Sequence, residues 1–380
     1  MPAIDVAVVG LGAMGSAALY HLSARGQRVV GLDRYPVGHT HGSSHGESRI
    51  IRLAYFEHPD YVPLLRLAYR NWRTLEAATG QAVLLTTGII EAGPPGSDIV
   101  AGSLASCVEH AIRHKVLSGA EITARFPALT LPADWTGVFQ PDAGILGPER
   151  IVALQVAAAK ANGAEVMEGA AVTSVRDLGG SVEVALADGS TISAGAAILT
   201  AGGWIGDLAP ALASNLRLTR QALVWFEPSR PALVTPDRMP IFMLDDPRTV
   251  TYGFPDWAGT GVKAASHDAG RLLASADDAR QDADETDIDL IADVLRDLVP
   301  AVAGPVRRMA TCFYTRTPDE HFILGPSPES PRVILASPCS GHGFKFASII
   351  GEILADLAIT GETDKPIGLF SPRRFNVGVA

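Results

Sequence analysis

The first 33 residues alternate between apolar runs and a helical pattern. Residues 4–9 form an almost unbroken apolar run, which predicts a short buried strand. An apolar pattern with helical spacing continues through Leu22, and a second apolar run over 27–32 predicts another strand that ends at Asp33. This strand–helix–strand order is typical of a doubly wound sheet with parallel strands.

Farther along the chain, the pattern changes repeatedly between the helical and the strand period. Strands are predicted where short apolar runs are bounded by turn residues, as at Gly179-Gly180 and Asp188-Gly189. The interval 217–315 predicts several strands and one helix. The predicted helices are 61–78, 99–114, 147–162, 286–298 and one that ends near 358, and the predicted strands outside that interval are 82–91, 164–168, 170–176, 181–187, 191–199 and 331–336.

Composition limits the class of protein. The chain has 380 residues, 47% of them hydrophobic, so it can bury a large core and is not a disordered chain. Its formal net charge of −10, without a basic stripe, disfavours nucleic acid as a partner. No apolar run reaches the length of a membrane span, and the N-terminus lacks the basic region of a signal peptide. With three cysteines and no metal-ligand spacing, we expect a cytoplasmic protein without a disulfide framework.

A glycine signature follows the first predicted strand. Gly10, Gly12 and Gly15 match the spacing Gly-x-Gly-x-x-Gly. In this motif the first glycine permits a tight turn, the second lets the backbone approach a pyrophosphate, and the third lets the helix pack closely on the strand. Asp33 lies about 20 residues farther on, where a carboxylate can bind the hydroxyls of a ribose. The motif predicts a dinucleotide site, although it does not separate NAD from FAD.

A polar segment after the second strand carries three histidines, His39, His41 and His45, among glycines and serines. Their spacing matches no common zinc pattern, so we expect no metal and interpret the segment as a loop folded over a ligand. Arg49 and Arg52 follow among isoleucines and a leucine. Burying an arginine requires an anionic partner. For each of these arginines the partner is either a ligand anion, such as a phosphate, a carboxylate or a reduced flavin, or an Asp or Glu of the protein itself.

Several segments together resemble one enzyme family. Residues 41–52 resemble the flavin loop of the monomeric sarcosine oxidase and N-methyltryptophan oxidase family, which belongs to the D-amino-acid oxidase superfamily. Residues 312–323 are similar to its covalent-flavin segment, and residues 340–353 are similar to its C-terminal glycine turn and helix. The stretch 252–255 is of the kind found in its substrate domain. The resemblance extends from residue 4 to about residue 375.

The resemblance implies FAD as the cofactor, attached by a thioether between Cys312 and the 8α carbon of the flavin. Arg49 would stabilise negative charge on the reduced ring, and the turn Gly341–Gly343 at the start of the last helix would favour the same anion. The cofactor-binding residues implied by the motifs and the resemblance are Gly10, Gly12, Gly15, Asp33, Arg34, Ser43, Ser44, His45, Ser48, Arg49, Val172, Ala201, Gly202, Trp204, Cys312, Gly341, Gly343, Phe344 and Lys345.

The resemblance also implies a substrate site. Arg52 and Lys345 resemble the pair that binds the carboxylate of an amino acid, where two cations supply both charge and orientation. Tyr252, His267 and Tyr314 resemble pocket residues around a secondary amine. These five residues are therefore expected to be catalytic.

Lys263 resembles the lysine beside the flavin that assists the reaction with oxygen. A buried ammonium there would stabilise the negative charge that oxygen acquires. The implied reaction is oxidation of a secondary, N-methyl amino acid by oxygen. It yields an imine, which becomes formaldehyde and glycine when the substrate is sarcosine, together with hydrogen peroxide.

Three departures from the family leave the substrate open. Leu53 stands where the family suggests a histidine, and residues 56–59 stand where it suggests a glycine-rich lid. Pro338-Cys339 precedes the glycine turn, where a small or aromatic pair is usual in the family. A bulkier or cyclic secondary amino acid, such as N-methyltryptophan, pipecolate or proline, is therefore an alternative substrate. Two readings from other classes are a nicotinamide-dependent dehydrogenase and a flavin-binding protein without turnover.

The implied architecture is α/β (α+β overall), with two interleaved domains. A Rossmann-like FAD-binding domain would comprise residues 1–85, 145–216 and 316–380. A mainly antiparallel substrate domain would comprise residues 86–144 and 217–315. The family often works as a monomer, so we expect a monomer whose partners are a small secondary amino acid and molecular oxygen, with no membrane or nucleic acid among them.

Overall fold

The computed structural model describes residues 4–268, 270–280 and 284–375. The helices are α1 (Ala13–Ala24), α2 (Val62–Thr79), α3 (Asp98–Glu109), α4 (Gly119–Arg125), α5 (Pro148–Ala161), α6 (Ile205–Leu208), α7 (Pro210–Ala213), α8 (Glu285–Leu298) and α9 (Ala347–Thr360). The strands are β1 (Ile4–Val9), β2 (Val29–Asp33), β3 (Arg49–Ile51), β4 (Leu84–Thr86), β5 (Ile89–Gly93), β6 (Lys115–Ser118), β7 (Thr136–Gln140), β8 (Gly144–Leu146), β9 (Glu165–Glu168), β10 (Val172–Asp177), β11 (Val182–Leu186), β12 (Thr191–Leu199), β13 (Arg217–Phe226), β14 (Ile241–Asp246), β15 (Thr249–Gly253), β16 (Val262–Ser266), β17 (Arg271–Leu273), β18 (Val306–Arg316), β19 (Ile323–Pro326) and β20 (Val333–Ser337).

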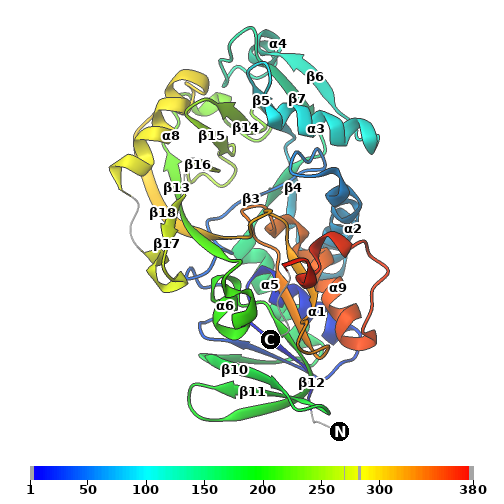
Figure 1. Ribbon diagram of the computed structural model, residues 1–380. Coiled ribbons are helices and arrows are strands. Elements are labelled where there is room, and N and C mark those ends of the chain that lie inside the picture. The colour runs from blue at the N-terminus through cyan, green and yellow to red at the C-terminus, as the bar shows by residue number, and fades with distance from the viewer. Residues whose placement is uncertain (1–3, 269, 281–283, 376–380) are drawn as a thin grey trace.

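The nucleotide-type sheet has the order β10-β11-β12-β1-β2-β9, and β20 pairs with β12 and with β19. The strands β20, β12, β1, β2 and β9 run parallel to their neighbours in this series. Helix α1 packs against both α5 and α9, and the three helices cover the apolar face of these strands. Figure 1 shows the antiparallel hairpin β10–β11 at the outer end of this sheet.

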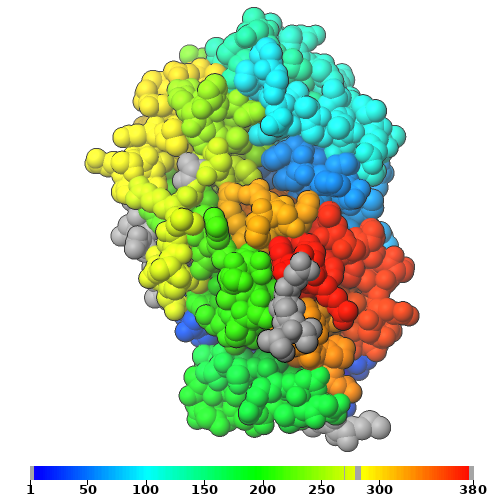
Figure 2. Space-filling view, viewed as in Figure 1, coloured from blue at the N-terminus to red at the C-terminus, as the bar shows by residue number. Residues whose placement is uncertain are grey.

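A second sheet, which we call the upper sheet, has the order β17-β13-β16-β15-β14-β5-β7-β6, with β18 paired to β13. Its pairings are antiparallel except that between β14 and β5. Segments far apart in the chain therefore lie side by side, as the cyan and yellow-green regions of Figure 2 show. A small sheet, β3-β8-β4, lies separately. The predicted α/β fold with a parallel and a mainly antiparallel sheet is confirmed.

Some local predictions are wrong in detail. The single strand predicted over 82–91 is two strands, because Gly88 has φ +73° and its N–H turns to the carbonyl of Ala143. The helix predicted over 99–114 ends at Glu109, since Ala111 has φ +48°, and β6 follows. The elements between 115 and 146 were not predicted individually. The predicted domain limits at residues 1 and 380 lie outside the described residues.

The last long helices agree with their patterns. The helix predicted over 286–298 is α8, whose N-terminus carries a capping box in which Asp284 and Asp287 bond each other's backbone N–H. The final predicted helix is α9, which ends at Gly361 in the left-handed conformation. Within the described residues, no helix is both long and apolar enough to cross a membrane.

Candidate active site

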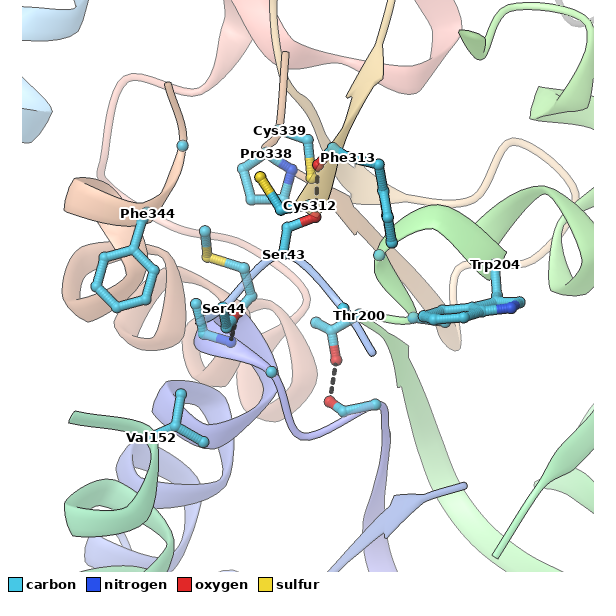
Figure 3. A pocket seen from close by; sticks show the side chains of 18 of the residues that line it. Ser43, Ser44, Val152, Thr200, Trp204, Cys312, Phe313, Pro338, Cys339 and Phe344 are labelled. Carbon is cyan, nitrogen blue, oxygen red and sulfur yellow. Dashed lines mark hydrogen bonds between the residues drawn. The ribbon is translucent and has the colours of Figure 1, made fainter. Parts of the chain in front are cut away.

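A cavity of about 580 Å³ lies between the nucleotide-type sheet and the upper sheet. Its wall includes the ends of β1 and β2 on one side and side chains of β13, β15 and β18 on the other. Figure 3 shows Cys312, Ser43, Pro338 and Cys339 gathered on one side of it, with Phe344 and Trp204 at opposite edges of the view. A cavity of this size between two layers is the default position for a ligand site.

The first glycine turn forms one end of the wall. Gly10 has φ +90°, and a Cβ there would lie 2.7 Å from the carbonyl oxygen of Thr200. At Gly15 a Cβ would lie only 1.7 Å from the carbonyl oxygen of Gly10, so this glycine allows α1 to approach the turn. The Asp33 carboxylate accepts hydrogen bonds from the N–H groups of Leu11, at 2.7 Å, and Tyr35, at 2.9 Å. These contacts hold the turn in place beside the cavity.

The polar loop folds across the middle of the wall, as its glycines and serines suggested. The Ser43 hydroxyl donates to the carbonyl oxygen of Phe313 at 2.6 Å, and the Ser44 hydroxyl accepts from the N–H of Ala13 at 3.0 Å. Arg49 donates to the carbonyl oxygens of Ser43 and Ser48. The guanidinium of Arg49 is thus fixed by its own loop while it lines the cavity.

The second glycine turn closes the same cavity from β20. Gly341 has φ +84° and its added Cβ would lie 2.7 Å from the Tyr314 ring. A Cβ at Gly343 would lie 1.5 Å from the carbonyl oxygen of Pro338. The chain continues through Phe344 and Lys345, both on the wall, into α9.

Cys312 lies on β18 with its side chain 3% exposed and facing the cavity. Burial raises the pKa of its thiol, and the nearby cations of Arg49 and Lys263 act in the opposite direction. The chain thus places a buried thiol near the side chains of Arg49 and Lys263.

The five residues expected at a substrate site all line the cavity. They are Arg52, Tyr252, His267, Tyr314 and Lys345. The rings of Tyr252 and His267 have centroids 6.5 Å apart, and those of His267 and Tyr314 are 6.0 Å apart. Burial lowers the pKa of His267 to about 4, so its imidazole is neutral at pH 7.

Arg52 already has anionic partners within the protein. Its Nη2 donates to both oxygens of Glu57, at 2.8 and 2.7 Å, and its Nε lies 3.3 Å from Glu91. Although burial opposes their charged forms, the pair stays ionised: Glu57 and Glu91 raise the pKa of Arg52, and Arg52 with Lys345 helps lower the pKa of Glu57 to about 2.

Glu57 and Glu91 are functional-site residues that the sequence did not single out. The expectation that Arg52 needs an anion was sound, and an internal acid was one of the two alternatives. Glu91 stands in an otherwise apolar strand, Ile89–Gly93, and is fully buried. A charged residue inside such a run was the available signal.

Lys345 and Lys263 are both buried lysines. The Lys345 Nζ donates to the carbonyl oxygen of His342 at 2.9 Å, and burial lowers its pKa to about 7. The Lys263 Nζ donates to the carbonyl oxygens of Gly46 and Ser48, both at 2.8 Å, and burial lowers its pKa well below the usual value.

Most of the predicted site residues therefore meet at one cavity. Those on its wall are Gly10, Gly12, Asp33, Arg34, Ser43, Ser44, Arg49, Arg52, Val172, Ala201, Gly202, Trp204, Tyr252, His267, Cys312, Tyr314, Gly341, Gly343, Phe344 and Lys345. Gly15, His45, Ser48 and Lys263 are not among the described residues that line it. Gly15 lies in the first turn of α1, and His45 and Ser48 lie in the polar loop. Lys263 lies on β16, and its Nζ bonds that loop at the carbonyl oxygens of Gly46 and Ser48. Of the residues that the structure describes, no group of His, Cys, Asp and Glu is arranged to hold a metal ion.

Comparison with known proteins identifies the family. The model of the family described as FAD dependent oxidoreductase matches residues 5–357. The chain belongs to this family. It is 39% identical to the monomeric sarcosine oxidase of Streptomyces avermitilis over 98% of both chains. It is 33% identical to the N-methyl-L-tryptophan oxidase of Yersinia pestis, over 98% of this chain and 99% of that one. The predicted family relationship is confirmed.

Among solved structures, this FAD dependent oxidoreductase resembles NikD, an unusual amino acid oxidase essential for nikkomycin biosynthesis, in its open form. The TM-score is 0.85, the sequence identity is 26%, and 97% of each chain is covered. The likeness extends over both sheets and supports the same overall architecture.

The cavity of this FAD dependent oxidoreductase fits the cofactor of its family. Two turns, at Gly10 and at Gly343, bring bare backbone to the wall where any Cβ would collide with a carbonyl oxygen. The start of α1 at Ala13 also faces the cavity, so its N-terminal dipole favours an anion such as a pyrophosphate. Arg49 supplies a fixed cation farther along the same wall.

Proposed function

We propose that the protein is a FAD-dependent oxidase of secondary, N-methyl amino acids, similar to sarcosine oxidase. Oxygen is the electron acceptor, and the products are an imine and hydrogen peroxide. The observation that carries the proposal is the shared cavity: two cations, two tyrosines and a neutral histidine line its end next to Cys312 and the second glycine turn. The names of the relatives at 39% and 33% identity support it.

In this proposal, Arg52 and Lys345 orient the substrate carboxylate, and Tyr252, His267 and Tyr314 surround its amine. The buried rings exclude water, which favours the neutral amine that oxidation requires. FAD supplies the two-electron acceptor for the carbon–hydrogen bond next to nitrogen. Lys263 assists the reaction of the reduced cofactor with oxygen.

In this proposal the cofactor would be held by the residues that the sequence motifs and the family resemblance imply. The turn at Gly10, Gly12 and Gly15 would take the pyrophosphate, and Asp33 with Arg34 would lie at the adenosine end. Ser43, Ser44, Arg49 and the turn Gly341–Gly343 would contact the flavin, with His45 and Ser48 behind them. Val172, Ala201, Gly202 and Trp204 would line the remaining wall, together with Phe344. Cys312 would form the covalent thioether.

The remaining features belong to the same proposal. The FAD-binding domain comprises residues 1–85, 145–216 and 316–380, and the substrate domain comprises residues 86–144 and 217–315. The protein acts in the cytoplasm as a monomer on a small amino acid, without nucleic acid or membrane as a partner.

The test is peroxide release by the purified, yellow protein. Sarcosine, N-methyltryptophan, pipecolate and proline are supplied separately, with glycine as the primary-amine control. Peroxide with at least one secondary amino acid, and loss of turnover in Arg52→Leu with an unchanged flavin spectrum, is the expected result. No peroxide with any of them, or activity that depends on added NAD, would reject the proposal.

A further inference from the structure

The backbone of residues 46–48 is held from two opposite sides. On one side, the Glu149 carboxylate accepts the N–H of Gly46 at 2.6 Å and that of Glu47 at 3.1 Å. On the other, the Lys263 Nζ donates to the carbonyl oxygens of Gly46 and Ser48 at 2.8 Å each. The same short piece of backbone therefore joins Glu149 and Lys263.

This backbone has a conformation that needs support. Gly46 has φ +93° and Glu47 has φ +65°, and the left-handed region is unfavourable for a residue with a side chain. The Glu47 carboxylate accepts from the indole of Trp225 at 3.0 Å and from the hydroxyl of Thr260 at 2.9 Å. These contacts hold the side chain of Glu47, whereas Glu149 holds its backbone N–H. Glu149 therefore holds the N–H of the peptide whose carbonyl oxygen, that of Gly46, binds Lys263. This carbonyl oxygen also accepts from the N–H of Ser48, and the Ser48 carbonyl oxygen also accepts from Arg49. Without Glu149, the Gly46–Glu47 peptide loses the contact on its N–H side.

Glu149 also contributes charge. The charged and titratable groups around Lys263 are Arg49, His45, Cys312, Glu47 and Glu149. Of these, Arg49 opposes the protonated lysine, while Glu47 and Glu149 favour it. Glu47 is shared with Arg308, whose guanidinium lies 2.7 Å away. Glu149 is thus an anion that accepts hydrogen bonds from the loop of residues 46–48, the same loop to which Lys263 donates.

We propose that Glu149 is a positioning residue that fixes Lys263 for the reaction of the reduced flavin with oxygen. The inference rests on the proposed role of Lys263. In that reaction, oxygen takes two electrons from the reduced flavin and two protons, and hydrogen peroxide and oxidised flavin result. Lys263 stabilises the negative charge that oxygen acquires with the first electron. Glu149 acts only through the loop and through its charge.

The experiment compares Glu149→Gln with wild type, as holoproteins. The flavin is reduced by light under anaerobic conditions, mixed with oxygenated buffer, and its reoxidation is followed by absorbance, so no amino acid is needed. We expect reoxidation to slow by about tenfold or more, since a single electrostatic contact of this kind contributes ~10²-fold. The loss should grow as pH rises, because removing Glu149 lowers the pKa of Lys263 further.

Glu76→Gln is the matched control. The Glu76 carboxylate also accepts two backbone N–H groups, those of Val83 and Leu84, at 2.8 and 3.0 Å, but this backbone is not the loop that Lys263 binds. It should reoxidise at the wild-type rate. A crystal structure of Glu149→Gln should show the Lys263 Nζ moved away from at least one of its two carbonyl oxygens, a readout independent of activity.

A double-variant comparison tests the route of the effect. Lys263→Met should slow reoxidation, and adding Glu149→Gln to it should slow it no further. Three outcomes would each overturn the inference. The first is an unchanged reoxidation rate in Glu149→Gln, and the second is that Glu149→Gln slows reoxidation as much in the Lys263→Met background as in wild type. The third is that Glu149→Gln slows anaerobic reduction of the flavin by an amino acid as much as it slows reoxidation. If wild type oxidises no amino acid, the proposed function fails, yet the reoxidation comparison still decides the role of Glu149.

Discussion

At the scale of single residues, the part of the cavity proposed to bind substrate contains buried charges of both signs. Arg52 and Lys345 are the cationic residues here, and Glu57 and Glu91 both form ion pairs with the guanidinium of Arg52. Burial lowers the pKa of Lys345 to about 7 and raises that of Glu91 to about 7. Both groups lose a proton over the same pH range, and each loss makes the end of the cavity more negative.

This balance predicts how a carboxylate binds. A simple carboxylate such as propionate has no amine to titrate and is ionised at about pH 6, so its affinity should be highest there. Above pH 7 its affinity should fall by about tenfold per pH unit or more, because the protonated forms of Lys345 and Glu91 favour an added anion. The measurement is a titration of the flavin spectrum at several pH values.

Two variants separate the contributions. Glu91→Gln mimics the neutral form of Glu91, so it should reduce the pH dependence of propionate affinity. At pH 6 the affinity of this variant should stay within about twofold of the wild-type affinity. Lys345→Met should weaken binding at pH 6 by about tenfold, because one charge-assisted contact is lost. An affinity independent of pH from 6 to 9 in wild type contradicts the assignment of the carboxylate to this end of the cavity.

At the scale of elements, the two glycine turns determine the shape of the cavity. Gly343→Ala places a methyl group where the structure has 1.5 Å to the carbonyl oxygen of Pro338, and backbone cannot yield as a side chain does. We expect the purified variant to carry less than about a tenth of the wild-type flavin per chain, because the turn before α9 must move. The flavin-to-protein absorbance ratio measures this.

Gly180→Ala serves as the control for that substitution. Gly180 lies in the turn between β10 and β11, and a Cβ there would meet no atom within 4 Å. Its flavin content should equal that of wild type. Full flavin content in Gly343→Ala would mean that the turn adapts, and that its backbone is not required at the cofactor.

The same scale shows where sequence patterns succeed. The glycine motif and the predicted helix over 286–298 follow local rules, a tight turn and a capped amphipathic face, so sequence alone locates them. The region 115–146 depends on pairing partners far along the chain: β7 pairs with β5 and β6. The burial of such short strands, of four or five residues, depends on the strands with which they pair. Their local sequence therefore carries a weaker signal than a glycine motif or a capped helix does. The sequence offered an internal acid as one partner for Arg52, but it could not single out Glu91, since Glu91 reaches Arg52 from β5 only in the folded chain.

At the scale of the whole molecule, the cavity lies between two sheets, and each sheet is built from segments that are separate in the chain. Val9 and Asp33 come from the nucleotide-type sheet, and Tyr252 and Cys312 come from the upper sheet. A ligand in this cavity contacts both sheets, so it binds the folded protein and not the unfolded chain. Linkage then requires the cofactor to stabilise the whole fold.

The covalent attachment proposed at Cys312 would alter that linkage, which gives a prediction for stability. In wild type, a flavin attached at Cys312 cannot dissociate, so the unfolding midpoint temperature should not depend on added FAD. In Cys312→Ala the cofactor dissociates, and each tenfold rise in free FAD above its dissociation constant should add ~1.4 kcal/mol to the free energy of unfolding. Differential scanning calorimetry over a range of FAD concentrations measures both.

Cys339→Ala is the control, because Cys339 also lies on the cavity wall but on the segment after β20. It should keep its flavin in the pellet after acid precipitation and behave like wild type in the calorimeter. Cys312→Ala should release its flavin to the supernatant. A wild-type midpoint temperature that rises with added FAD would show that the cofactor exchanges freely, and Cys312 would then be a packing residue of β18. Loss of attachment in Cys339→Ala alone would move the thioether to the other thiol.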